Sequence, residues 1–227
     1  MKSAISLLLL GLCLIAGCAR LPRLSSLDGV PADCPGIWAR GKWQFVHIIE
    51  ATPPGRSVTT MMGVVQVSSA TRHLHCVLLT LEGLVLFEAE CGPSVTVLRA
   101  LPPFDNKGFA QGLIDDIRLI FLAPENISPI AGALDDGTVV CRYRLGGGET
   151  RDLSATSDGG WSLRCYRSAA RPEKTLIAQE NPAADGPAPI PAHLTLTTHG
   201  MLGYTLTLTL VEARPLTVPT ASHEARP

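Results

Sequence analysis

The sequence has no apolar run long enough to cross a membrane and little that suits nucleic acid. Its longest run, Ala4 to Ala16, would reach about 20 Å as a helix, against roughly 30 Å of bilayer hydrocarbon. Lysines number four, and 19 basic residues face 20 acidic ones along the 227-residue chain. This near-neutral composition predicts no nucleic-acid partner.

The common catalytic motifs are missing as well. The sequence contains no C-x-x-C, G-x-S-x-G or H-E-x-x-H, and the glycines from Gly146 are not followed by the Lys-Ser/Thr of a phosphate-binding loop. His73 and His75 would share one face of a strand while Cys76 points to the other, which disfavours a metal site. We therefore expect no enzyme, no metal and no cofactor.

The N-terminal stretch is the most informative part of the sequence. Lys2 supplies a positive start, the apolar run follows, and Ala16-Gly17 places two small residues before Cys18. Ile15-Ala16-Gly17-Cys18 resembles the lipobox of bacterial lipoproteins. The resemblance implies cleavage before Cys18, a diacylglyceryl group on its thiol and acylation, for example with palmitate, of its new amine. The alternative is a plain signal peptide.

This interpretation predicts a domain organisation and a location. Residues 1–17 would be a signal peptide, 18–36 a lipid anchor with a proline-rich tether, 37–213 one β domain, and 214–227 a disordered tail. Two or three acyl chains anchor a protein firmly, because each buried CH₂ contributes about 0.8 kcal/mol. By resemblance to bacterial sorting rules, Ala19 favours the outer membrane, with the protein on its inner leaflet facing the periplasm.

The folded part alternates mostly with period two, which predicts an antiparallel sheet. One helix is expected over Phe109–Leu122, with the apolar side of its surface toward the sheet and Asp115, Asp116 and Arg118 mostly on the wetter side. A helical turn is expected at 130–134 and a long loop at 171–192. The expected strands are 43–50, 58–67, 74–81, 84–91, 138–145, 161–167, 193–199 and 204–211.

Five cysteines remain beyond the signal and anchor, so they cannot all pair within the chain. Cys76 and Cys91 would lie diagonally across a hairpin, and Cys141 and Cys165 also fall on apolar strand faces. These four are the candidates for disulfide bonds, with the pairing left open. Cys34 is considered as a free thiol.

Several short stretches resemble the LolA and LolB proteins of bacterial lipoprotein localisation, and in particular LolB-like outer-membrane lipoproteins. They are 39–43 (Ala-Arg-Gly-Lys-Trp), 81–87 (Leu-Glu-Gly-Leu-Val-Leu-Phe), 101–103 (Leu-Pro-Pro), 111–116 (Gln-Gly-Leu-Ile-Asp-Asp) and 203–208 (Gly-Tyr-Thr-Leu-Thr-Leu). The resemblance implies an α+β fold, mainly antiparallel, in which an unclosed curved sheet or half-barrel is covered by one or two helices. The exposed apolar loop of LolB has no clear match here, since 132–134 (Gly-Ala-Leu) is a poor substitute.

The resemblance also implies a function: binding the acyl chains of lipoprotein cargo, or of another lipid, in trafficking to the outer membrane. Eight residues on the apolar faces of the predicted strands are the candidate lining residues, namely Val65, Leu78, Val85, Phe87, Val139, Leu196, Leu206 and Leu208. Two alternatives stay open. One is a non-enzymatic structural subunit of an envelope complex, whose helix packs the sheet shut. The other is an envelope enzyme that uses the Cys34 thiol.

Overall fold

A computed structural model describes residues 21–26, 34–167, 171–179, 191–200 and 203–216 of the chain. The predicted signal segment and Cys18 lie outside these residues, as does the chain beyond 216. Within the described residues, no helix is both long and apolar enough to span a membrane.

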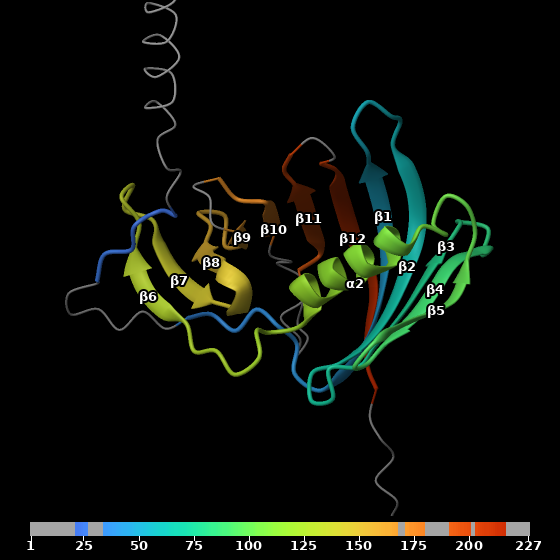
Figure 1. The fold of residues 1–227 in the computed structure, drawn as a ribbon, viewed down its shortest axis with the longest axis horizontal. Coiled ribbons are helices and arrows are strands. Elements are labelled where there is room, and N and C mark those ends of the chain that lie inside the picture. Colours follow the sequence, from blue (N-terminus) through green and yellow to red (C-terminus); the bar gives the residue numbers. More distant parts are fainter. Residues whose placement is uncertain (1–20, 27–33, 168–170, 180–190, 201–202, 217–227) are drawn as a thin grey trace, which may run out of the picture.

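Twelve strands and one α-helix make up the described part of the chain (Figure 1). The strands before the helix are β1 (Lys42–Thr52), β2 (Thr59–Ser68), β3 (Leu74–Leu79), β4 (Val85–Cys91) and β5 (Val95–Ala100). The helix is α2 (Lys107–Phe121), and a short 3-10 turn, η1, covers Gly146–Gly148. The remaining strands are β6 (Ile130–Ala133), β7 (Val139–Arg144), β8 (Glu149–Ala155), β9 (Trp161–Arg167), β10 (Lys174–Gln179), β11 (His193–Thr198) and β12 (Thr205–Pro215).

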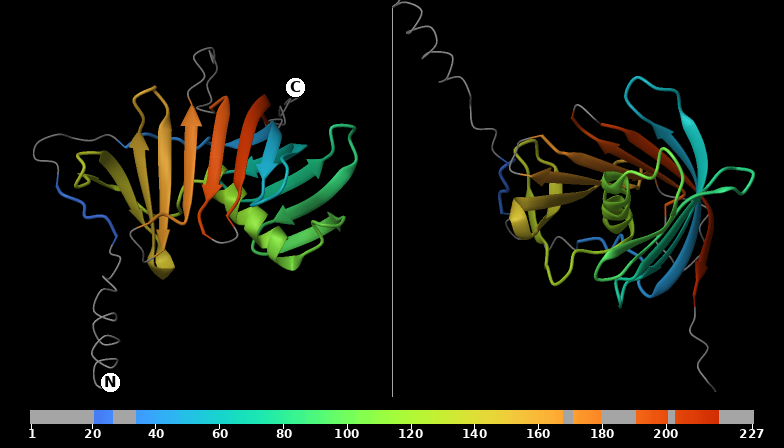
Figure 2. Two further views of the ribbon diagram at one scale, coloured as in Figure 1. Left: turned by 90° about the horizontal axis from the view of Figure 1, so that it is seen from above. Right: turned by 45° about the vertical axis from the view of Figure 1, so that its right-hand side comes forward.

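All twelve strands form one antiparallel sheet in the order β5-β4-β3-β2-β1-β12-β11-β10-β9-β8-β7-β6. The end strands β5 and β6 are not paired with each other, so the sheet curves without closing into a barrel. Figure 2 shows this curved sheet wrapping around α2. The predicted class, an unclosed and mainly antiparallel α+β fold, is confirmed.

The concave face is apolar because the strand registers bring alternate apolar residues into line. Phe45 lies opposite Val65, Val65 opposite Cys76, and Cys76 opposite Ala89, so one row crosses four strands. All four side chains are buried in one core cluster. Similar rows on β8 to β12 continue the core across the sheet, as the period-two pattern predicted.

The helix forms where the sequence predicted it, two residues earlier at its start. Asn106 caps it, because its side-chain oxygen accepts a hydrogen bond of 2.8 Å from the backbone N–H of Gly108. The helix ends at Phe121, and Pro124 follows close behind. Its buried side chains include Ile114, Ile117 and Ile120.

Some expected elements differ in the structure. Residues 130–133 form β6, not a helical turn, because their backbone pairs with β7. The expected loop at 171–192 contains β10, which pairs with β9 on one side and β11 on the other. The strands β5 and β8 were not expected either.

The disulfide candidates were wrong in three of four positions. Cys141 is bonded to Cys34, with an S–S distance of 2.06 Å and Cα atoms 5.7 Å apart. Cys76, Cys91 and Cys165 carry free, buried thiols in the described chain. Cys76 and Cys91 do lie diagonally, but each faces a different residue across the hairpin, Ala89 and Leu74 respectively. The pair stays unbonded.

Candidate functional site

The helix α2 lies in the concavity of the sheet, and aromatic contacts hold both of its ends (Figure 1). At its N-terminal end Phe109 meets Phe87 of β4 edge to face, with ring centroids 5.3 Å apart. At its C-terminal end Phe121 stacks on Phe45 of β1 at 4.9 Å. Such aromatic pairs contribute about 0.5–1.5 kcal/mol each beyond their buried area. The interface between α2 and the concave face is the candidate site.

Most of the predicted lining residues lie at this interface. Five of them belong to the buried core, and Leu206 is half-buried and packs against it. The five are Val65, Leu78, Phe87, Leu196 and Leu208. Their shared face is therefore as expected, while a role in binding a ligand stays a prediction.

Two predicted lining residues lie elsewhere. Val139 was wrong, because its side chain is 48% exposed at the start of β7, near the open end of the sheet. Val85 is half-buried and is not among the residues of the core cluster. A register shift between Leu78 and Leu79 pairs Val85 with Leu79, whose side chain is only half-buried.

The described side chains pack closely beneath the C-terminal end of α2. A hollow of about 20 Å³ lies there, lined by aromatic and aliphatic side chains that include Phe45, Phe121 and Leu194. That volume holds about one water molecule. At this end the helix therefore packs directly on the sheet.

Asp116 is a buried carboxylate in the middle of α2, although the sequence placed it on the wetter side. Its side chain is 3% exposed. One oxygen accepts a hydrogen bond of 2.6 Å from Nζ of Lys174 on β10, and the other accepts one from the hydroxyl of Tyr204, just before β12. Burial, with the neighbouring carboxylate, raises the pKa of Tyr204, which keeps the hydroxyl protonated as a donor. This polar cluster ties the helix to one half of the sheet.

A second polar contact ties α2 to the other half. Nη2 of Arg118 lies 3.0 Å from Sγ of Cys91 on β4, and Nη1 of the same side chain pairs with Asp115 at 3.5 Å. Arg118 also lines a cleft of about 240 Å³ between α2 and β8 to β10. The cleft walls mix both charges: Arg151 pairs with Glu149 and the exposed Arg167 lies near Glu173. A polar cleft therefore borders the apolar interface.

His47 is a polar group inside the apolar interior. It is 2% exposed on β1, its ring lies 5.8 Å from that of Phe121, and its Nε2 has no hydrogen-bond partner among the described residues. Burial lowers the pKa of His47 from 6.5 to about 4, so the imidazole is neutral near pH 7. An unpaired buried nitrogen costs roughly 1–3 kcal/mol.

The cysteine and histidine candidates do not form a catalytic or metal site in the described residues. Cys34 is bonded to Cys141, which contradicts an enzyme that uses a free Cys34 thiol. Burial raises the pKa of Cys76 and of Cys165 to about 12, so neither thiol is a ready nucleophile. His75 pairs with Glu88 at 3.0 Å, and no three potential metal ligands cluster within the described ranges.

Sequence patterns missed the polar side of the interface. His47 has the same strand parity as Phe45 and Ile49, so the period-two pattern did contain a signal for its burial. Lys174 and Asp116 are 58 residues apart, and their contact depends on β10, which the surrounding prolines concealed. No local pattern reports such a contact.

Two solved structures are similar to this chain. One is a LolA superfamily protein from Nitrosomonas europaea, with 12% identity and a TM-score of 0.42, covering 80% of this chain and 89% of that one. The other is described as an outer membrane lipoprotein-sorting protein domain from Vibrio parahaemolyticus, with 11% identity and a TM-score of 0.41, covering 80% and 86%. No family model and no curated protein sequence matches the chain. Similarities this distant do not carry function.

The Asp116 cluster leads to a stability prediction. In Lys174→Met the buried carboxylate keeps the Tyr204 hydroxyl but loses its cation, so we expect the free energy of unfolding to fall by about 1–3 kcal/mol. Arg167→Met is the matched control, because Arg167 and Glu173 are 3.8 Å apart and both largely exposed. Arg167→Met should lower the free energy of unfolding, measured in urea, by less than about 1 kcal/mol. Equal losses in the two variants would contradict the assignment.

His47 leads to a pH prediction. The unfolded chain takes up a proton on this residue below pH 6.5, whereas the folded chain does so only near pH 4. Stability should therefore fall as the pH drops from about 6.5 to 4, by roughly 3 kcal/mol in total. Urea unfolding across this range should show that loss in the parent and in His193→Leu, an exposed histidine, but not in His47→Leu. A His47→Leu variant with the parent's pH slope would contradict it.

Proposed function

We propose that this chain is a lipid-anchored protein of the bacterial envelope that holds an acyl chain of a lipoprotein or other lipid between α2 and the concave sheet. One observation carries the proposal. The curved sheet presents an apolar concave face, and among the described elements a single helix covers it. An acyl chain that enters beneath an outwardly displaced α2 would meet the same aliphatic surface.

The free energy gained by burying an acyl chain is comparable with that gained by burying the apolar side chains of α2. A ligand can therefore compete with the helix for the concave face. An acyl chain of about twelve methylenes gains roughly 10 kcal/mol of gross hydrophobic stabilisation on burial. The five main apolar side chains that α2 buries gain about 8–15 kcal/mol together. These are Ile114, Ile117, Leu119, Ile120 and Phe121. Neither occupant of the concave face wins by a wide margin, so a ligand can compete with the helix.

The connections of α2 also suit an outward movement of the helix. The segment before α2 contains Pro102 and Pro103, both exposed, and the segment after it contains Pro124 and Pro129. These connections lie outside the sheet, so moving the helix breaks no strand pairing, but it does disturb Phe104 and Ile127, which pack against the core.

The polar contacts of Asp116 and Arg118 would have to break, as would the hydrogen bond of 3.3 Å from Nε1 of Trp38 to the carbonyl of Leu119. Arg118 lines the adjoining cleft, where it would meet water.

The envelope location rests on the N-terminal sequence and on a disulfide. The lipobox-like residues 15–18 imply export and lipid attachment at Cys18. The bond between Cys34 and Cys141 supports an oxidising compartment, because disulfides are rare in the cytosol. Anchoring in the outer membrane, facing the periplasm, is part of the same proposal.

A second function is favoured by the close packing of the described core. The hollow beneath Phe121 measures about 20 Å³ and several core side chains are fully buried, which suits a helix that is a permanent part of the core. The chain would then act as a non-enzymatic structural subunit that contacts an envelope partner through its outer surface. A measurement of fatty-acid binding distinguishes the acyl-binding protein from the structural subunit.

Acyl binding is tested with the fluorescent fatty acid cis-parinaric acid on full-length, delipidated protein. We expect saturable fluorescence that palmitate displaces, and about 2.7 kcal/mol of stabilisation at a hundredfold excess of probe over its Kd. Lys174→Met, which weakens a tie on α2, should associate faster than the parent. Arg167→Met, in the exposed pair, should not. A chain that shows no saturable uptake, with Lys174→Met merely less stable, would favour the structural subunit.

Lipid attachment is tested by mass and by partitioning. The mature chain should begin at Cys18, carry the mass of a diacylglyceryl group and an amide-linked acyl chain, and enter the detergent phase in Triton X-114. Cys18→Ser should abolish both, whereas Cys13→Ser, inside the segment to be removed, should leave both unchanged. An unmodified mature N-terminus would refute the anchor.

A further inference from the structure

Residues 21–26, which we call the strap, lie beside β6 at the edge of the sheet, where Ser25 forms one antiparallel bridge with Ala133 (Figure 1). The backbone N–H of Ser25 donates to the carbonyl of Ala133 at 2.9 Å, and the N–H of Ala133 donates to the carbonyl of Ser25 at 3.0 Å. The sequence predicted a tether here. The strap is instead paired with the sheet and covers part of an otherwise open edge.

Gly132 of β6 makes this contact possible. A Cβ atom at that position would lie 2.5 Å from Cγ of Leu24 and 2.7 Å from the carbonyl oxygen of Ser25. Both distances are shorter than real carbon contacts allow, and the second involves backbone that cannot move away without breaking the pairing. The strap can therefore pair with β6 only if residue 132 is a glycine.

A buried ion pair also depends on the strap. Arg142 on β7 and Asp152 on β8 form two hydrogen bonds of 2.6 Å, and their side chains are 2% and 1% exposed. A further donor of the guanidinium, Nη1, reaches the carbonyl of Pro22 at 2.8 Å. A buried ion pair is stable only when its remaining donors are also satisfied, so the strap carbonyl completes this site.

The strap begins very close to the anchor. Leu21 is three residues after Cys18, a distance of at most about 11 Å even when the chain is fully extended. Pro22 lines a hollow of about 340 Å³ together with Asp135, Asp136 and Arg164. The turn between β6 and β7, which contains Asp135 and Asp136, therefore lies beside the first residues that the structure describes.

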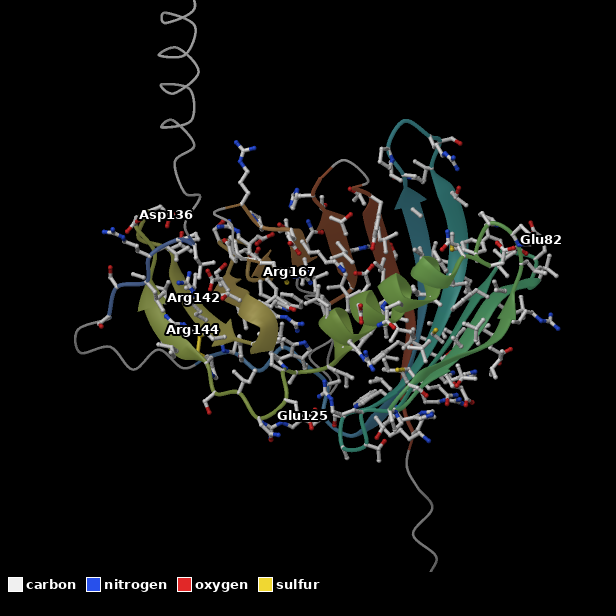
Figure 3. The ribbon with its side chains drawn as sticks, viewed as in Figure 1. Glu82, Glu125, Asp136, Arg142, Arg144 and Arg167 are labelled. Carbon is white, nitrogen blue, oxygen red and sulfur yellow. A yellow bond between two sulfur atoms is a disulfide. The ribbon has the colours of Figure 1, made fainter. Side chains whose placement is uncertain are left out.

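We propose that the strap holds the domain against the lipid surface in one orientation, with the β6–β7 turn next to the bilayer and the β3–β4 turn pointing away from it. Figure 3 shows Asp136 and Glu82, one from each turn, at opposite ends of the molecule. The inference rests on lipid attachment at Cys18. Without the strap, the next fixed point would be Cys34, and sixteen flexible residues would average about 20–24 Å.

The test uses the lipidated full-length chain in vesicles of phosphatidylethanolamine and phosphatidylcholine. A bimane fluorophore is attached at Asp136→Cys or Glu82→Cys, and the vesicles carry a nitroxide on the lipid headgroup, which quenches at short range. The remaining free thiols of the described chain are buried, so labelling in the folded state favours the new cysteine. We expect quenching at position 136 to be at least threefold stronger than at position 82.

Strap variants then test the cause. In the Asp136→Cys background, Gly132→Val should expel the strap and reduce quenching at least twofold, and Ser25→Pro, which lacks the N–H that Ala133 accepts, should do the same. Gly146→Ala is the matched control, because a Cβ there meets nothing within 4 Å. It should keep the parent's quenching.

The outcomes separate this inference from the proposed function. A chain that carries no lipid and does not float with the vesicles overturns both. A chain that floats, yet is quenched equally at positions 136 and 82, overturns only the fixed orientation. Unchanged quenching in both Gly132→Val and Ser25→Pro also overturns it, because the orientation would then owe nothing to the strap.

Discussion

The central constraint on this fold is that a curved sheet which does not close must have its concave apolar face covered. A closed barrel buries such a face with its own strands, whereas here β5 and β6 are not paired with each other and α2 covers the face. The helix sequence reflects that demand, since Ile114, Ile117 and Ile120 are all buried. Everything proposed about a ligand follows from it, because whatever replaces the helix must offer the same apolar surface.

Polar groups in the interior make the helix position specific without making it much more stable. Aliphatic packing alone would tolerate a slide or rotation of α2, since hydrophobic contact has no direction. The Asp116 carboxylate tolerates neither, because both of its oxygens have fixed donors, Lys174 and Tyr204. His47, by contrast, lowers the stability of the core. Its unpaired nitrogen beside Phe121 weakens the core where α2 ends.

The sequence predicts an element well when the apolar period lies within that element, and poorly when the element forms because distant strands pair with it. The strands β1 to β4, the helix α2 and the final pair β11–β12 were predicted, since each carries its own period of apolar residues. β6 is short and Gly/Ala-rich, and β10 lies in a proline-rich region, so both are strands mainly because neighbours pair with them. The Cys34–Cys141 bond spans 107 residues and could not be read from strand faces. The helical pattern likewise placed Asp116 on the wetter side of α2, and it could not report Lys174 and Tyr204, which meet the buried carboxylate.

The same reasoning explains why the N-terminal segment was expected to be a tether. Its prolines and its lack of an apolar period predict no regular secondary structure, and within it residues 21–26 form one isolated β-bridge and no strand. These patterns say nothing about an edge strand that needs covering or a buried guanidinium that needs an acceptor. The strap meets both needs through backbone groups, of which the N–H of Ser25 is one that any residue except proline would supply. What does depend on sequence is Gly132 on the opposite side of the contact. A segment that looks unstructured can therefore be fixed by the surface it meets, and here that surface also determines how close the domain sits to its anchor.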